Sequence, residues 1–157
     1  MGIGGAVVIN GSVFPGAFGN AGEFAGILPP ELQQERPSLE LLRLTMAKHG
    51  HAYRDIYEMI RHFDLSHPGV AEWIAIAAPK LSAIASAVAA VIDPEAIVLG
   101  GRIPKSLATR LTEAIQFYNV PRRGISRPIP KIIVSEVEGD AAAIGAASMP
   151  LKSRFFC

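Results

Sequence analysis

GIGGAVVINGSVF, residues 2–14, is the stretch that decides how this chain begins to fold. Two apolar runs flank Asn10-Gly11, a pair that readily supplies the positive φ angles of a type I′ turn, so a β-hairpin is predicted here. A glycine cluster at the mouth of a hairpin can bring backbone N–H groups close to phosphate oxygens. Gly4 and Gly5 are therefore candidates for a phosphate-binding loop, and an ordinary glycine-rich hairpin entry is the competing interpretation.

A second glycine-rich turn follows the hairpin at residues 16–22 and ends at Glu23. A carboxylate in such a turn can accept hydrogen bonds from sugar hydroxyls, whereas the competing interpretation is a solvated loop carboxylate. A phosphate-binding loop beside a hydroxyl acceptor is typical of a protein that handles both a sugar and a nucleotide. The pattern therefore suggests a sugar kinase.

Composition predicts one globular domain in a reducing compartment. The chain has 157 residues, of which 50% are hydrophobic and 18% charged, and its net charge is +1. This balance provides no electrostatic footprint for nucleic acid. The single cysteine, Cys157, excludes an internal disulfide, and no secretory signal pattern is present. We expect a cytoplasmic protein without membrane contact, and we interpret the apolar residues 74–92 as a buried helix.

The remaining sequence predicts an α/β order of elements. Residues 15–37, rich in Gly and Pro, predict an extended loop. Helices are expected after an N-cap at Ser38, over 52–62, over 68–92, over 105–118, and over 141–147 after a cap at Asp140. Pro79 should kink or split the long helix. Strands are expected at 96–99 and 132–134, with a sharp turn at Gly100-Gly101 between the first strand and the next helix.

Three motifs, taken in order, resemble the ROK family of repressors, open reading frames and sugar kinases. They are the glycine pattern of residues 2–23, Ile97-Val98-Leu99-Gly100-Gly101, and the run of small residues at 139–147. The resemblance covers nearly the whole chain. It implies the C-terminal lobe of an actin-like ATPase (ribonuclease H-like) fold, an α/β lobe with a mixed sheet and packed helices.

The same resemblance implies a single domain over 1–157 that is incomplete without an N-terminal lobe. Residues 1–26 would form the phosphate and sugar hairpin and loop, 38–92 the helices, and 96–147 the adenosine-side strand and helix unit. Its exposed cleft wall and closing helix would form an interface, so we expect a homodimer or higher oligomer.

Site residues follow from the resemblance position by position. The positions that match nucleotide-binding residues are Gly4, Gly5, Gly100 and Gly101. Those that match sugar-binding residues are Asn20, Glu23 and Glu40. A plain strand-to-helix turn competes at Gly100 and Gly101. At Glu40 the alternative is strong, because the helix dipole favours an acidic residue in a first helical turn.

The catalytic aspartate of the family would lie in the other lobe, and no Asp-x-Gly-Gly segment occurs in this chain. We therefore expect no catalytic residue here and no phosphoryl transfer by the chain alone, although a complete kinase would use ATP and Mg²⁺. The alternative parent is a ROK transcriptional regulator, in which this lobe senses a small-molecule sugar. DNA would then be bound only through a helix-turn-helix outside this chain.

The chain departs from the family at its zinc site. Gly26 stands where many members have a histidine, and residues 27–32 contain no cysteine, so a structural thiolate zinc site is not expected. A His-x-His pair such as His49 and His51 can bind a metal in a strand, but this pair flanks Gly50 between two helices and has no nearby carboxylate or cysteine partner in the sequence. We therefore interpret the four histidines of the chain as solvated residues at helix ends, namely His49, His51, His62 and His67.

Overall fold

The predicted hairpin is present at the start of the chain. In the computed structural model, which describes residues 2–33, 35–118, 124–137 and 140–155, β1 (Val7–Ile9) pairs antiparallel with β2 (Ser12–Phe14). Asn10 has φ 51° and Gly11 has φ 73°, which confirms the two positive φ angles expected of the turn.

The loop that follows contains two short helices that the sequence did not predict, η1 (Phe24–Ile27) and α1 (Pro30–Gln33). Glycines allow this loop to return onto the chain entry. A β-carbon at Gly22, where φ is 108°, would lie 2.2 Å from the carbonyl oxygen of Gly5. The hairpin therefore packs through the Gly5 backbone onto the loop that follows it.

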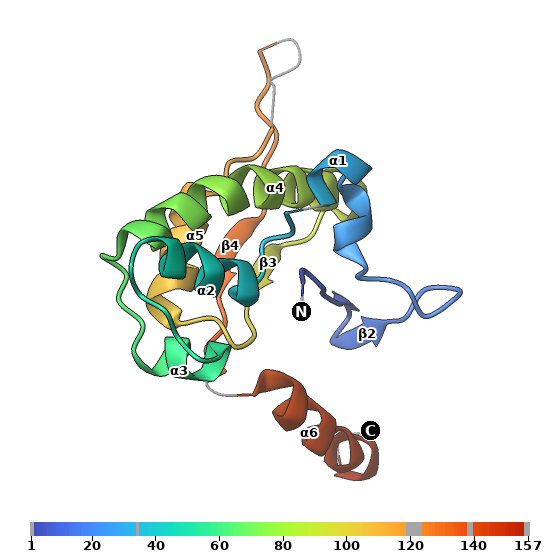
Figure 1. The fold of residues 1–157 in the computed structure, drawn as a ribbon. Helices are drawn as coiled ribbons and strands as arrows, with labels where there is room; N and C mark the ends of the chain where they lie inside the picture. Colours follow the sequence, from blue (N-terminus) through green and yellow to red (C-terminus); the bar gives the residue numbers. More distant parts are fainter. Residues whose placement is uncertain (1, 34, 119–123, 138–139, 156–157) are drawn as a thin grey trace.

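Three helices lie together, with α2 (Leu39–Lys48) and α3 (Ile56–Arg61) at the left of Figure 1 and α4 (Pro68–Ile92) above them. The predicted cap is confirmed, because Ser38 Oγ accepts from the Leu41 N–H at 3.0 Å. Helix α3 begins later than expected, since the Asp55 carboxylate caps it by accepting from the Glu58 N–H at 2.8 Å.

Helix α4 is not split at Pro79, and it continues unbroken for 25 residues. Its length and mean hydropathy of 1.8 meet the criteria for a membrane-crossing helix. Only one face of this helix is buried, and its C-terminal end is open, with Val91 81% exposed. The helix that we expected to be buried over residues 74–92 is therefore buried only in part.

A strand–helix–strand unit packs beside α4. β3 (Ala96–Leu99) pairs in parallel with β4 (Lys131–Val134), and α5 (Lys105–Ala114) lies between them in the chain. Helix α5 ends before the predicted residue 118, because hydroxyl groups of α4 capture the next backbone N–H groups. Gln116 N–H donates to Ser82 Oγ at 2.9 Å, and Tyr118 N–H donates to Ser86 Oγ at 2.8 Å.

The described residues form a mixed α/β fold, about half helical, with two separate two-stranded sheets. The single mixed sheet that we expected is thus replaced by two small ones, since the hairpin packs on its own following loop and β3 pairs with β4. The closing helix α6 (Ala141–Phe155) runs well beyond the predicted residue 147. Its predicted cap is confirmed, because Asp140 Oδ1 accepts from the Ala143 N–H at 3.2 Å.

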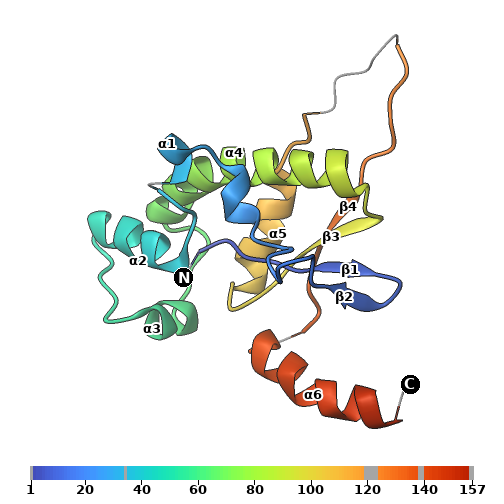
Figure 2. The ribbon, with the colours of Figure 1, turned by 90° about the vertical axis from the view of Figure 1, so that its right-hand side faces the viewer.

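The core lies between α2, α3, α4 and α5, whereas the hairpin and α6 lie to one side of this body (Figures 1 and 2). The buried core side chains are Leu42, Met46, Met59, Val70, Trp73, Ala77, Leu107 and Leu111. Large apolar side chains of the hairpin and α6 are exposed, among them Val13 at 67% and Met149 at 70%. The expected self-association stays a prediction.

Candidate functional site

The turn at Gly100-Gly101 separates two cavities. The first, cavity A, has a volume of about 530 Å³ and is formed where the chain entry, the start of α2, the middle of α4, the β3–α5 turn and the start of α6 meet. The second, cavity B, has a volume of about 480 Å³ and lies toward α3 and β4. Residues 99–103 and Asp140 line both cavities, so the glycine turn is the wall between them.

Cavity A brings together glycines that lie far apart in the sequence. Gly4, Gly100 and Gly101 all line it. A β-carbon at Gly4 would meet no atom within 4 Å, and the same holds at Gly101, where φ is 104°. Open space therefore lies against both backbones, as a ligand that approaches the main chain requires.

Gly5 has a different role from its neighbour. A β-carbon at Gly5 would lie 2.4 Å from the Phe24 ring, and Gly5 does not line either cavity. Packing against Phe24 and Gly22 accounts for a glycine at this position. The structure therefore brings Gly4, but not Gly5, to the Gly100-Gly101 turn.

Trp73 forms part of the wall of cavity A and fixes the start of α2 beside it. The indole, 3% exposed, donates from Nε1 to the carbonyl oxygen of Ser38 at 3.1 Å. Ser38 and its neighbours Pro37 and Leu39 line the same cavity. Because Trp73 is the single tryptophan of the chain, the fluorescence of the protein reports on this one side chain, which belongs both to the core and to the wall of cavity A.

A polar cluster joins three elements at the boundary of the cavities. Arg102 donates from Nη2 to Asp140 Oδ2 and from Nη1 to Tyr57 Oη at 2.9 Å, with its guanidinium carbon 5.5 Å from the centre of the Tyr57 ring. The hydrogen bond from Arg102, followed by that from the Ala143 N–H, holds the pKa of Asp140 below its ordinary value. The same pairing with Asp140 raises the pKa of Arg102. The cluster therefore ties α3, the glycine turn and the start of α6 together in charged form.

The candidate sugar ligands lie away from cavity A. Asn20 and Glu23 are exposed in the loop after the hairpin, and among the described residues their side chains make no hydrogen bond or ion pair. They do not line cavity A or cavity B. Both side chains are accordingly free to bind a hydroxyl group, but the structure does not bring them to the glycine turn.

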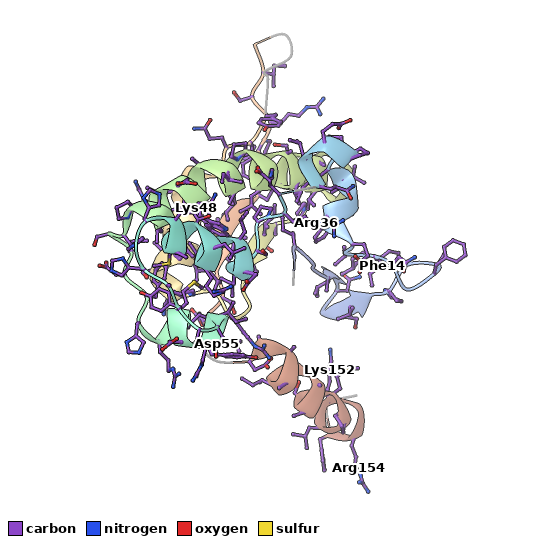
Figure 3. The ribbon with its side chains drawn as sticks, viewed as in Figure 1. Phe14, Arg36, Lys48, Asp55, Lys152 and Arg154 are labelled. Atoms are coloured by element: carbon purple, nitrogen blue, oxygen red, sulfur yellow. The ribbon has the colours of Figure 1, made fainter. Side chains whose placement is uncertain are left out.

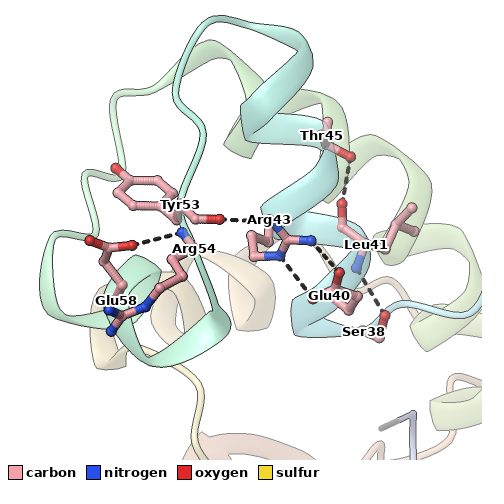
Figure 4. Close-up of polar contacts among 8 residues, drawn as sticks. All are labelled: Ser38, Glu40, Leu41, Arg43, Thr45, Tyr53, Arg54 and Glu58. Carbon is pink, nitrogen blue, oxygen red and sulfur yellow. Dashed lines mark hydrogen bonds and ion pairs between the residues drawn. The ribbon is translucent and has the colours of Figure 1, made fainter.

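Glu40 lies in a separate cleft of about 370 Å³ between α2 and the start of α3. Arg43 donates to both of its carboxylate oxygens, at 3.0 Å from Nε and 2.5 Å from Nη2, and also to the carbonyl oxygen of Tyr53 at 2.8 Å (Figure 4). This hydrogen bonding from Arg43 lowers the pKa of Glu40. Glu40 is therefore already paired within the protein.

The histidine interpretation was wrong in two respects. His67 is only 6% exposed, and its Nε2 lies 2.7 Å from His51 Nδ1. His49 has a carboxylate partner after all, since its Nε2 lies 2.7 Å from Glu72 Oε2. The expectation failed because α4 returns alongside α2 and brings His67 and Glu72 to the two histidines at the end of α2. In the part of the chain that the structure describes, no three His, Cys, Asp or Glu side chains are grouped so as to hold a metal ion.

Sequence reasoning also missed Arg102, Tyr57 and Trp73 as residues around the cavities. Arg102 directly follows Gly100-Gly101, so the sequence alone could have predicted its position beside the turn. Tyr57 and Trp73 reach the cavities only through the packing of α3 and α4, which no local pattern indicates.

Comparison with known proteins gives one informative match. No family model matches the chain. A protein described as "Uncharacterized protein y4fQ" from Sinorhizobium fredii (strain NBRC 101917 / NGR234) is 38% identical over 157 residues, which is 99% of this chain and 39% of that protein. The chain therefore spans about two fifths of the length of this relative.

Proposed function

We propose that this chain is the sugar- and nucleotide-binding lobe of a ROK sugar kinase-like protein, with cavity A as the nucleotide site. In this proposal the two small sheets and their helices correspond to the C-terminal lobe of an actin-like ATPase fold. The observation that carries it is the meeting of Gly4 with Gly100 and Gly101 in one cavity, from two motifs that lie far apart in the sequence.

The cavity suits a nucleotide in size and in chemistry. Its volume of about 530 Å³ lies within the range of small-molecule sites. Apolar side chains from three elements can cover a base and ribose, and they include Leu39, Leu81, Val98 and Ile103. The bare backbone at Gly4 leaves room for phosphate oxygens.

The sugar would be bound by the exposed Asn20 and Glu23, whose side chains are free to accept hydroxyl hydrogens. Glu40 would join them only by exchanging its hydrogen bonds from Arg43. In a complete kinase, ATP supplies the phosphoryl group and Mg²⁺ neutralises its charge. The base that deprotonates the sugar would come from a segment outside this chain, so the chain alone binds but does not phosphorylate.

Titration with Mg-ATP, followed by Trp73 fluorescence and by calorimetry, tests the nucleotide site. We expect saturable binding that Gly4→Val weakens at least tenfold, since its side chain would fill the cavity. Gly26→Val is the matched control, because a β-carbon at Gly26 also meets nothing within 4 Å and Gly26 lies outside the cavity. No binding by the wild-type chain, or equal binding by the two variants, would contradict the proposal.

The alternative is the sugar-sensing lobe of a ROK transcriptional regulator. The length of the relative leaves room for it, because this chain covers 39% of that protein. The remainder has room for an additional segment, such as one that binds DNA. A lobe of this kind would gain thermal stability with a sugar and not with Mg-ATP, and the same titrations repeated with a panel of hexoses and amino sugars separate the two functions.

A further inference from the structure

Three histidines and one carboxylate meet where the end of α2 packs against the start of α4, and none of the four lines cavity A or cavity B. His49 is the C-cap of α2, His51 follows in the loop, and His67 is the N-cap of α4. Glu72 pairs with His49 from the next turn of α4. We name the pair His51 and His67 the histidine clamp.

The hydrogen bonds of the clamp fix the tautomers of both rings. The Gly69 N–H donates to His67 Nδ1 at 3.1 Å, so this nitrogen carries no hydrogen and Nε2 carries it. That Nε2–H donates to His51 Nδ1 at 2.7 Å, so His51 also carries its hydrogen on Nε2. Each of these two hydrogen bonds requires that the accepting ring is neutral, because a proton on its Nδ1 would place one N–H donor against another.

Burial and neighbouring charges act on the clamp from every element packed against it. Burial, followed by the nearby His51 and His49, holds the pKa of His67 below its ordinary value, and the Asp64 carboxylate opposes this. The rings of His51 and His67 lie edge to face with centres 4.2 Å apart. On the far side, Glu72 faces His49 at 2.7 Å and Lys48 at 4.0 Å.

The clamp closes a junction in which two helices touch through their backbones. A β-carbon at Gly69 would lie 2.7 Å from Met46 Cα, so the first turn of α4 lies directly on α2. A positive charge on His67 would also stand at the N-terminus of α4, where the helix dipole disfavours it. Protonation therefore removes the cap, breaks the link to His51 and introduces repulsion at the same point.

We propose that the histidine clamp is a pH-sensitive device that holds the loop after α2 onto the start of α4 when both rings are neutral and releases it on acidification. The release acts on the helix that carries Trp73 into the wall of cavity A. The device does not depend on which ligand that cavity binds, so it stands or falls separately from the proposed nucleotide site.

The direction of the pH effect follows from linkage. Because the pKa of His67 is depressed in the folded state, the unfolded chain takes up the proton first as the pH falls through the ordinary histidine value of about 6.5. The contribution of His67 to stability is therefore complete above that value. It is lost as the pH falls from there toward the folded pKa.

Urea unfolding between pH 8 and pH 5 tests the clamp in the full chain. We expect the urea midpoint of the wild type to fall on acidification below about pH 6.5. His67→Asn, which keeps a capping oxygen without a titrating ring, should show a clearly flatter pH profile. His62→Gln is the control, because His62 is exposed at the end of α3 outside the clamp, and it should follow the wild type.

Nitrogen-15 NMR of the imidazole rings in the wild-type chain tests the same proposal without any variant. At pH 8 both His51 and His67 should carry the hydrogen on Nε2, and their link should disappear together with amide protection at the start of α4 on acidification. An Nδ1–H tautomer at His67, or an equal pH profile in wild type and His67→Asn, would overturn the proposal.

Discussion

The helical body and the peripheral pair of hairpin and α6 are built on different physical principles. In the body, Leu42, Met46 and Leu107 are fully buried and pack on one another's helices. In the periphery, Val13 of the hairpin is 67% exposed and Met149 of α6 is 70% exposed. The body is therefore stabilised by burial of its own apolar area, whereas the periphery gains little stability in that way.

Polar contacts instead hold the periphery in place. Lys152 of α6 donates from Nζ to the carbonyl oxygen of Gly11 at 2.8 Å, so α6 and the hairpin contact each other beside the body (Figure 3). Asp140, bonded to Arg102, ties the other end of α6 to the glycine turn. The hairpin and α6, which we expect to face a partner, are therefore attached to the body mainly by a few charged and hydrogen-bonded side chains.

A core truncation should show the largest difference between the two regions. Leu42→Ala removes a fully buried side chain and should cost about 2–5 kcal/mol of unfolding free energy. Val13→Ala in the hairpin, where the side chain is 67% exposed, should change it by less than about 0.5 kcal/mol. Urea unfolding of both variants provides the measurement, and equal losses would contradict the division into body and periphery.

Substitution of a glycine in each region should also give different losses of stability, with a smaller difference than the core truncation gives. Gly69→Ala forces a β-carbon against Met46 Cα and should cost about 1–3 kcal/mol. Gly145→Ala in α6 meets open space and should leave global unfolding unchanged while raising the helical circular dichroism signal slightly. A loss of stability in Gly145→Ala comparable with that in Gly69→Ala would show that α6 is packed as the body is.

The cap of α2 should have a more modest effect. Ser38→Ala removes the acceptor for the Leu41 N–H and should cost about 1 kcal/mol in thermal or urea unfolding. Ser106→Ala, at an exposed position near the start of α5, is the control and should be close to neutral. Similar losses of unfolding free energy in the two serine variants would mean that the Ser38 cap does not stabilise α2.

The smallest global effect is expected at the tie between α6 and the body. Asp140→Asn weakens the pairing with Arg102 and should speed amide hydrogen exchange throughout α6 without shifting the global unfolding midpoint. Because the pKa of Asp140 is depressed, the tie should persist above the ordinary aspartate value of about 3.9 and be lost as the pH falls through the folded pKa.

Asp93→Asn, at the left-handed C-cap of α4, is the charge-matched control and should leave exchange in α6 unchanged. A fall in the global midpoint of Asp140→Asn would instead make α6 part of the cooperative body.

Features set by neighbouring residues were predictable from the sequence. The Asn10-Gly11 turn and the caps at Ser38 and Asp140 depend on a few adjacent residues, and the structure contains all three. The end of α5 was not predictable, because hydroxyl groups of Ser82 and Ser86 on another helix determine it. The histidine clamp was not predictable for the same reason, since only the packing of α4 on α2 brings His67 to His51.

The candidate site shows the same division. Glycine motifs in the sequence indicated where the backbone is bare, and Gly4 does meet Gly100 and Gly101 at one cavity. Gly5 is the next residue after Gly4 and is also a glycine, yet the Phe24 ring occupies the space beside it. Whether a glycine serves a turn, a packing contact or an open cavity depends on residues distant in sequence, which a motif does not contain.

The most direct test of the account is an amide NMR titration of the isotope-labelled chain with Mg-ATP. We predict that the amide signals of Gly4, Gly100 and Gly101 shift together, with one common dissociation constant, while that of Gly5 shifts less. Shifts confined to a single one of these segments, or none at saturating nucleotide, would contradict a nucleotide site in cavity A.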